Sequence, residues 1–224
     1  MMNDKQRVAI HAAQKIQKDQ LVGLGTGSTA NFFIEALAER VKNDNLQIQV
    51  VSSSVVSAIK ARSLGLPMLS LEDIDRLDVY VDGADEVTPE LTLLKGRGFD
   101  LVREKLLAKA SEAFWVLIDP SKRVERLGQN FPIPVEVMPA AWRLVQASLN
   151  ALGGNAQLRV NGDGLWVTSH GSLVLDTVFA QTVDASALND QLNDIPGIVE
   201  HGIFKGLASA VFCATEGRVE ESWV

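Results

Sequence analysis

Four short and mostly apolar runs, separated by segments with helical spacing, constrain most strongly how this chain can fold. The runs lie at residues 21–24, 48–51, 77–81 and 114–118. Continuous apolar strands are typical of parallel sheets, which are buried on both faces, and the connections between parallel strands are usually helices. The chain is therefore predicted to be an α/β protein with a mostly parallel sheet and helices on both faces.

The pattern changes after residue 130. Three prolines fall within 131–139. Because proline lacks a backbone N–H group, this segment is expected to be a crossing segment or a sheet edge. A helix and three strand-like runs follow, around Arg159, Trp166 and Leu173. This α+β order predicts a smaller domain inserted into the first.

The predicted domains have uneven sizes. The smaller α+β domain is expected at 131–204, and the larger domain comprises 1–130 with 205–224. The last apolar run, from Leu207 to Cys213, is expected to return to the first sheet.

The composition excludes several classes of protein. With 28 acidic and 21 basic residues, the chain has a formal net charge of −7 and lacks the basic footprint of a nucleic-acid-binding protein. Its one cysteine, Cys213, cannot form an internal disulfide and is expected to be a buried thiol. No segment has the roughly 18 consecutive apolar residues that span a bilayer, and the charged N-terminus does not read as a signal peptide. We therefore expect a cytoplasmic protein without nucleic-acid or membrane partners.

A glycine-rich loop, Gly25-Thr26-Gly27-Ser28-Thr29, follows the first predicted strand and opens a helix. Glycines let a ligand approach the backbone, the hydroxyls of Ser28 and Thr29 can bind it or cap the helix, and a helix N-terminus attracts anions. The loop therefore predicts a phosphate cradle, with a tight turn that binds nothing as the alternative. It also fits the dinucleotide pattern GxGxxA, but the next strand lacks the expected ribose-binding acid, which favours a small phosphorylated ligand.

Three carboxylates follow the third predicted strand, in the segment Asp82-Gly83-Ala84-Asp85-Glu86. Ligands bind beyond the carboxyl ends of parallel strands, so these groups are candidates for acid–base chemistry or for hydrogen bonds to sugar hydroxyls. A solvated acidic loop is the alternative. A metal site is not favoured, because His11, His170 and His201 are far apart and show no ligand spacing.

Cationic groups come next along the chain. Lys95-Gly96-Arg97-Gly98 forms a glycine-flanked loop that suits a phosphate or an oxyanion. Glu104 follows near the start of a predicted helix, and Lys122 follows the fourth strand. Each of these two is either a site residue or an ordinary surface residue. The agreement among four consecutive strand ends favours a binding site at this edge of the sheet.

These motifs, in this order, resemble the type A ribose-5-phosphate isomerase family. The matching segments cover nearly the whole chain and are Gly25–Thr29, Ser52–Ser54, Asp82–Glu86, Lys95–Gly98, Arg103–Lys105, Phe131–Glu136 and Ile195–Glu200. The resemblance implies a Rossmann-like domain with a smaller α+β domain. It also implies an isomerase of ribose 5-phosphate and ribulose 5-phosphate that uses no metal or other cofactor and forms a homodimer or a homotetramer.

The resemblance further implies roles for individual residues. Glu104 would be the general base that moves a proton between C1 and C2, and Lys95 would stabilise the enediolate oxygen. Asp82 and Asp85 would contact the sugar and assist ring opening. The other residues that would hold the substrate and its phosphate are Thr26, Gly27, Ser28, Thr29, Gly83, Ala84, Gly96, Arg97, Gly98 and Lys122.

One loop departs from the family pattern. The family usually has Lys-Gly-Gly-Gly and small residues here, whereas this chain has Arg97, Phe99 and Asp100. Arg97 would be strained if its position requires a positive φ. We favour the interpretation that Arg97 points to solvent or adds a phosphate contact, with a changed or weakened substrate preference as the alternative.

Two other functions compete with the isomerase. A non-catalytic sugar-phosphate sensor of the same fold is disfavoured because the chain keeps Glu104 and has no basic helix-turn-helix segment. An NAD(P)-dependent oxidoreductase is disfavoured by the missing acidic residue after the second strand.

Overall fold

The computed structural model describes residues 2–98, 100–180, 184–215 and 217–224, which form two compact units. The first unit contains the described residues of Met1–Ala84, Arg103–Lys122 and Leu207–Val224, and the second contains those of Asp85–Val102 and Arg123–Gly206. The proposed division into domains stays a prediction, because these units are defined by packing and not by independent folding.

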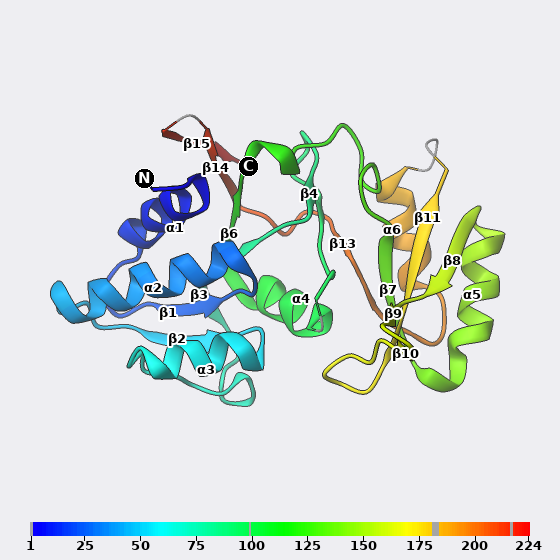
Figure 1. Cartoon of the computed structure of the whole chain (residues 1–224), viewed down its shortest axis with the longest axis horizontal. Helices are drawn as coiled ribbons and strands as arrows, with labels where there is room; N and C mark the ends of the chain where they lie inside the picture. The colour runs from blue at the N-terminus through cyan, green and yellow to red at the C-terminus, as the bar shows by residue number, and fades with distance from the viewer. Residues whose placement is uncertain (1, 99, 181–183, 216) are drawn as a thin grey trace. The chain divides into compact units, whose positions relative to one another are not determined.

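A six-stranded sheet forms the centre of the first unit (Figure 1). Its strands, in spatial order, are β15 (Arg218–Trp223), β14 (Ala210–Thr215), β6 (Ser111–Ile118), β3 (Leu77–Gly83), β1 (Leu21–Leu24) and β2 (Gln49–Ser52). The five strands from β14 to β2 pair in parallel, and β15 pairs antiparallel with β14. This order confirms the predicted parallel sheet and the return of the C-terminal run to it.

Helices and the sheet share the core of this unit. The helices are α1 (Asp4–Lys15), α2 (Ser28–Asn43), α3 (Val55–Ser63) and α4 (Leu101–Ala110), with short 3₁₀ turns η1 (Leu71–Asp73) and η2 (Pro120–Lys122). α1 and α2 lie side by side and bury Val79 and Val81 of β3 (Figure 1). Because side chains alternate along a strand, Tyr80 points to the other face, where its ring stacks on Phe114 with centroids 4.8 Å apart. Both faces of the sheet are therefore buried.

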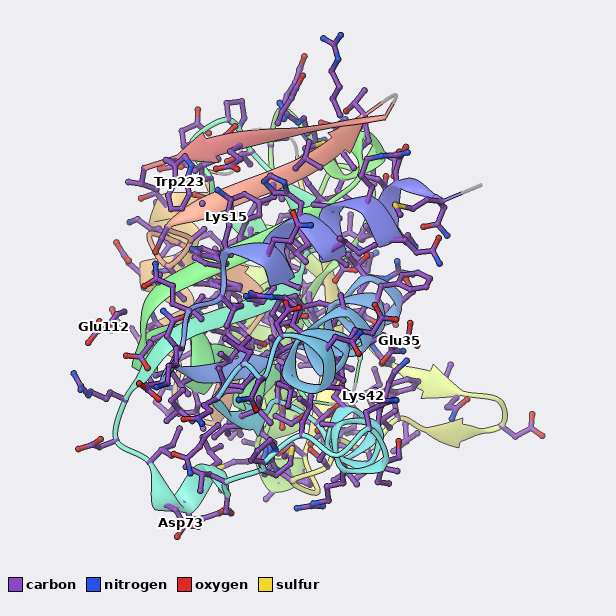
Figure 2. All side chains as sticks on the ribbon, turned by 90° about the vertical axis from the view of Figure 1, so that its left-hand side faces the viewer. Lys15, Glu35, Lys42, Asp73, Glu112 and Trp223 are labelled. Carbon is purple, nitrogen blue, oxygen red and sulfur yellow. The ribbon has the colours of Figure 1, made fainter. Side chains whose placement is uncertain are left out.

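The first helix and the last strand stabilise one another, although they lie at opposite ends of the sequence. Glu221 of β15 lies 2.8 Å from Lys15 Nζ and 2.6 Å from His11 Nε2. The Lys15 ammonium also lies 6.0 Å from the ring centroid of Trp223, and Figure 2 shows both side chains on this face. The neighbouring strand β14 carries Cys213, which is buried as expected.

The second unit is built on a four-stranded antiparallel sheet. Its strands, in spatial order, are β12 (Ile198–His201), β7 (Ile133–Val137), β11 (Leu173–Phe179) and β8 (Gly154–Leu158). Val145 and Leu149 of α5 (Trp142–Ala151) and Leu188 of α6 (Ala185–Asn193) pack with this sheet in one core. The smaller elements are β4 (Glu86–Val87), β5 (Leu93–Leu94), β13 (Ile203–Phe204), the hairpin β9 (Val160–Asn161) with β10 (Gly164–Leu165), and the 3₁₀ turn η3 (Pro139–Ala141).

The expectation of an edge or a crossing segment at 131–139 is wrong, because β7 lies between β12 and β11. The register with β12 extends from Val137 only to Val135, so Pro134 is not required to donate to that strand. The Pro134 carbonyl, which proline retains, accepts a hydrogen bond from the Gly202 N–H group at 2.8 Å. A proline is therefore tolerated near the beginning of an interior strand.

Candidate functional site

Asp82, near the end of β3, organises the loop that follows β1. Its Oδ1 accepts hydrogen bonds from the backbone N–H groups of Thr26 at 3.0 Å and of Gly83 at 2.7 Å. The carboxylate lies so close to Gly25 that a Cβ atom there would come within 2.1 Å of Oδ1. The glycine therefore allows this buried carboxylate to contact the loop directly.

The serine turn after β2 supports the same loop. Thr26 Oγ1 lies 3.0 Å from Ser53 Oγ, and the Ser57 hydroxyl donates to the Gly25 carbonyl at 2.8 Å. Ser54 caps α3 by accepting from the Ser57 N–H group at 3.1 Å. Hydroxyl groups thus hold the glycine-rich loop in one conformation.

The N-terminus of α2 is suited to an anion. Gly27 is the N-cap residue, with a φ of 106° and no side-chain cap hydrogen bond. The expectation that Ser28 or Thr29 caps the helix is wrong, because the helix already begins at Ser28. The first turn contains no acidic residue, so its N–H groups and the positive end of the helix dipole favour a bound anion.

Lys5 of α1 adds a positive charge at this helix end. Its Nζ donates a hydrogen bond to Ser28 Oγ at 3.0 Å, and Ser28 itself is exposed. No sequence pattern predicts Lys5 as a site residue, because the packing of α1 against α2 brings it to Ser28 across 23 positions.

The charges of Asp82 and Glu104 both act on Tyr80. Its hydroxyl donates to Asp82 Oδ2 at 2.6 Å, and Glu104 in the first turn of α4 is 6% exposed. Burial raises the pKa of Tyr80 well above its ordinary value, and the negative charges of Asp82 and Glu104 raise it further. Tyr80 therefore stays a neutral hydrogen-bond donor at physiological pH. Nothing in the apolar run 77–81 distinguishes this tyrosine from a core residue.

Lys122 lies at the same edge of the sheet as Asp82. It ends η2, directly after β6, and its N–H group donates to the Asp119 carbonyl at 3.1 Å. β6 is the parallel neighbour of β3, with Asp82 opposite Val116, so the carboxyl ends of the two strands coincide. The side chain of Lys122 is half-buried.

In the second unit, Asp85 and Lys95 lie at neighbouring positions because β4 pairs with β5. The Asp85 N–H group donates to the Leu94 carbonyl at 2.8 Å. Lys95 is 4% exposed, its N–H group donates to the Gly202 carbonyl at 2.9 Å, and its ammonium lies 5.7 Å from the ring centroid of Phe204. The carboxylate-bearing and the ammonium-bearing residues are thus adjacent on a hydrogen-bonded frame.

Glu86, the third carboxylate of the acidic segment, serves the local fold. It is fully buried and accepts hydrogen bonds from the N–H groups of Gly128 at 2.6 Å, Asn130 at 2.5 Å and Phe131 at 3.0 Å. A buried carboxylate that accepts hydrogen bonds from three backbone N–H groups holds that loop in place.

The Lys95–Gly98 loop accommodates Arg97 without the backbone strain that a positive φ would cause at this position. Gly96 has the positive φ, 96°, and Arg97 is not among the described non-glycine residues with a positive φ. Arg97 is exposed, and its guanidinium lies 4.0 Å from the ring centroid of Phe131. This position supports the interpretation that Arg97 is a tolerated variation.

The end of this loop is held by a second contact. Asp100 is buried and accepts a hydrogen bond from Ser169 Oγ at 2.7 Å. Gly98 is exposed, with open space where a Cβ atom would stand, and Phe99 lies outside the described residues. Asp100 thus contributes to the fold of the loop.

The site residues predicted from the sequence divide between the units. The first unit carries Thr26, Gly27, Ser28, Thr29, Asp82, Gly83, Ala84, Glu104 and Lys122, and the second carries Asp85, Lys95, Gly96, Arg97 and Gly98. Within the part of the chain that the structure describes, no group of three or more His, Cys, Asp or Glu side chains is placed to hold a metal ion. The helices of that same part include none with both the length and the apolar character needed to cross a membrane.

Known proteins are similar to this chain over nearly its full length. Residues 49–218 match the family described as ribose 5-phosphate isomerase A (phosphoriboisomerase A). The chain is 44% identical to the ribose-5-phosphate isomerase A of Methanothermobacter thermautotrophicus, over 96% of this chain and 95% of that protein. It is 42% identical to that of Thermococcus kodakarensis, over 96% of each. The chain therefore belongs to the ribose 5-phosphate isomerase A family.

Solved structures agree with this assignment. The ribose 5-phosphate isomerase A of Methanocaldococcus jannaschii superposes with a TM-score of 0.93 at 35% identity, over 98% of both chains. A D-ribose-5-phosphate isomerase in complex with phospho-erythronic acid superposes with a TM-score of 0.94 at 38% identity, over 100% of both chains. The predicted family resemblance and the α/β fold class are both confirmed.

Proposed function

We propose that this chain interconverts ribose 5-phosphate and ribulose 5-phosphate. The observation that carries the proposal is the pair of buried carboxylates, Asp82 and Glu104, whose negative charges both raise the pKa of Tyr80, in a chain of this family. Isomerisation of an aldose needs a base beside the carbon that loses a proton and a donor beside the oxygen that gains charge.

The proposed reaction moves protons and one electron pair within the substrate and leaves its atoms and electrons unchanged in number. Glu104 removes the C2 proton of the open-chain aldose, the released electron pair forms a C1–C2 double bond, and O1 becomes an oxyanion. Glu104 then returns a proton to C1, while the hydroxyl on C2 gives its proton to O1 and becomes the ketone. No external oxidant or reductant enters, so the proposed reaction requires no redox cofactor. Lys95, which has a compact positive charge, stabilises the developing oxyanion.

Asp82 and Asp85 are assigned to the sugar and to ring opening. Asp82 has a second task in this proposal, since its hydrogen bond to Thr26 fixes the loop that receives the phosphate. A carboxylate that binds both loop and sugar would couple phosphate binding to ring opening.

The phosphate is assigned to the N-terminus of α2. Thr26, Gly27, Ser28 and Thr29 supply hydroxyl and N–H donors, and Lys5 supplies the positive charge beside Ser28. The remaining residues assigned to substrate contacts are Gly83, Ala84, Gly96, Arg97, Gly98 and Lys122. Phospho-erythronic acid, the ligand of the related isomerase, carries a phosphate and a carboxylate, the two kinds of charge that these groups suit.

We also propose that the chain forms a homodimer or homotetramer and acts in the cytoplasm, on the basis of the family to which it belongs. Sedimentation velocity at micromolar concentration distinguishes a monomer from either assembly.

The test is conversion of ribose 5-phosphate by the purified chain in D₂O with EDTA present. We expect ribulose 5-phosphate to form and to carry solvent deuterium at C1, because the proton resides on Glu104 between its two positions. Product without any deuterium, together with near wild-type turnover by Glu104→Gln, would favour direct hydride transfer and contradict the base mechanism. Binding of ribose 5-phosphate without turnover would establish the sensor instead.

A further inference from the structure

We propose that Arg159 and Asp176 form a positioning pair that fixes the Gly96–Arg97 peptide and, through it, the loop of Lys95. This inference rests on the proposed isomerase function. Neither residue belongs to a sequence motif for the site, and neither is expected to touch the substrate.

Each of the three guanidinium nitrogens of Arg159 donates a hydrogen bond. Its Nε and Nη2 donate to Asp176 Oδ2 and Oδ1 at 2.8 and 2.6 Å, and its Nη1 donates to the Gly96 carbonyl at 3.0 Å. The side chains of Arg159 and Asp176 are only 11% and 24% exposed. A bidentate pair of this kind fixes the plane of the guanidinium, so the third bond has a defined direction.

The pair connects the loop to the most regular part of the second unit. Asp176 lies in β11, opposite Pro134 of β7 and Gln157 of β8. The Arg159 N–H group donates to the Val174 carbonyl at 2.8 Å, which ties the chain after β8 to β11. Strands paired on both sides are rigid supports, and a site held by them is more precisely placed than one held by a loop.

The hydrogen bond from Arg159 to the Gly96 carbonyl also orients the N–H group of the next residue. A trans peptide directs its C=O and N–H groups in opposite directions, and the described residues contain no cis peptide bond. When Arg159 holds the Gly96 carbonyl, it therefore also sets the direction of the Arg97 N–H group. The loop needs such control because Gly96, with a φ of 96°, has more conformational freedom than other residues.

Lys95 precedes this peptide directly, and its own N–H group is held by the Gly202 carbonyl at 2.9 Å. The backbone of Lys95 and Gly96 is thus fixed on both sides, by Gly202 before and by Arg159 after. Donors aimed at a developing oxyanion act only when they are oriented before the reaction. A buried ion pair contributes little net stability compared with apolar residues, so orientation of this loop is the better physical account of the pair.

The experiment compares Asp176→Asn, Arg159→Lys and Arg159→Met with the wild type and with Arg143→Met. Arg143 is the matched control, because it is an exposed arginine of the same unit whose guanidinium lies over Trp142, 5.1 Å from its ring centroid. Steady-state kinetics on ribose 5-phosphate are measured together with inhibition by phospho-erythronic acid and by inorganic phosphate. Thermal unfolding identifies any variant that fails to fold.

We expect Asp176→Asn and Arg159→Met to lower kcat about tenfold or more, while KM changes less than about threefold. Inhibition by phospho-erythronic acid should weaken in parallel with kcat, because its carboxylate resembles the charged oxygen, and inhibition by phosphate should not change. Arg159→Lys keeps the charge without the fork and should lie in between. If Arg159→Met is unfolded, the kinetics of Asp176→Asn and Arg159→Lys test the inference.

A kcat within about twofold of the wild type in folded Asp176→Asn and Arg159→Lys would overturn the inference. Equal weakening of both inhibitors would overturn it as well, because that result indicates general loosening of the protein. A wild-type chain that does not turn over ribose 5-phosphate would instead overturn the proposed function, and the positioning role with it.

Discussion

The hydroxyl of Tyr80 lies 2.6 Å from Oδ2 of Asp82, while Oδ1 of the same carboxylate accepts hydrogen bonds from the loop after β1. The two oxygens of Asp82 thus join the buried face of β3 to the glycine-rich loop. Tyr80 and Asp82 can meet because residues two positions apart in a strand share one face. The strand period itself therefore places the donor beside the carboxylate.

Replacement of Tyr80 by Phe removes this donor and leaves a buried carboxylate oxygen short of one hydrogen bond. We expect a loss of about 1–3 kcal/mol in the free energy of unfolding, measured by urea denaturation. Because the same carboxylate holds Thr26, the KM for ribose 5-phosphate should rise as well. An unfolding free energy and a KM both equal to those of the wild type would show that the bond has no role in the loop.

Replacement of Glu104 by Gln keeps the shape of the side chain and removes the base. We expect kcat for ribose 5-phosphate to fall by about 10²–10⁴-fold, with little change in the affinity for inorganic phosphate. Glu112→Gln is the control, because Glu112 is an exposed glutamate of the same unit that pairs with Arg76. Near wild-type turnover in Glu104→Gln would make another group the base.

Replacement of Lys5 by Met tests the phosphate subsite. Loss of a charge-assisted contact worth about 1.5 kcal/mol should raise the KM for ribose 5-phosphate and the inhibition constant of phosphate by about tenfold. The change in kcat should be smaller, because Lys5 is not assigned to the reacting carbons. The control is Lys42→Met in the last turn of α2, which carries no proposed role (Figure 2). An unchanged inhibition constant for phosphate in Lys5→Met would move the phosphate elsewhere.

Glu221 makes the stability of the first unit depend on pH. Its hydrogen bond with Lys15 lowers the pKa from 4.5 to about 2, partly opposed by burial and supported by His11 and Trp223. A carboxyl whose pKa is lower in the folded state stabilises the fold above its unfolded pKa and loses this effect as pH falls. The contribution is therefore complete above about pH 4.5 and disappears toward about pH 2.

We expect Glu221→Gln to lower the melting temperature at pH 7 by about 2–4 °C, which corresponds to roughly 1 kcal/mol for a partly exposed pair. The difference from the wild type should shrink between pH 4.5 and pH 2. Calorimetry at pH 7, 4 and 3 measures it. A difference that does not depend on pH would assign the effect to packing and not to charge.

The sequence predicted the strands of the first unit well, because β1, β3 and β6 each contain a short, mostly apolar run whose side chains are mostly buried. It predicted β7 poorly, since Pro134 indicates an edge unless the partner strand is known to stop at Val135. The prediction that Ser28 or Thr29 caps α2 is also wrong, because the N-cap residue is Gly27, which has no side chain that could indicate a cap in the sequence. The assignment of the predicted site residues to catalysis stays a prediction, which the variants above test.

The sequence by itself determined the fold class and the family, because these depend on apolar runs and motifs whose residues lie close together along the chain, and it predicted ligand-binding chemistry at the strand ends. Only the tertiary structure decided that Lys5 reaches Ser28, that Glu86 supports a loop and that Arg159 holds the Gly96 carbonyl. Each of these contacts joins residues more than twenty positions apart. Such contacts depend on how helices and strands pack, and hydrophobic periodicity encodes the elements but not the partners of their polar groups.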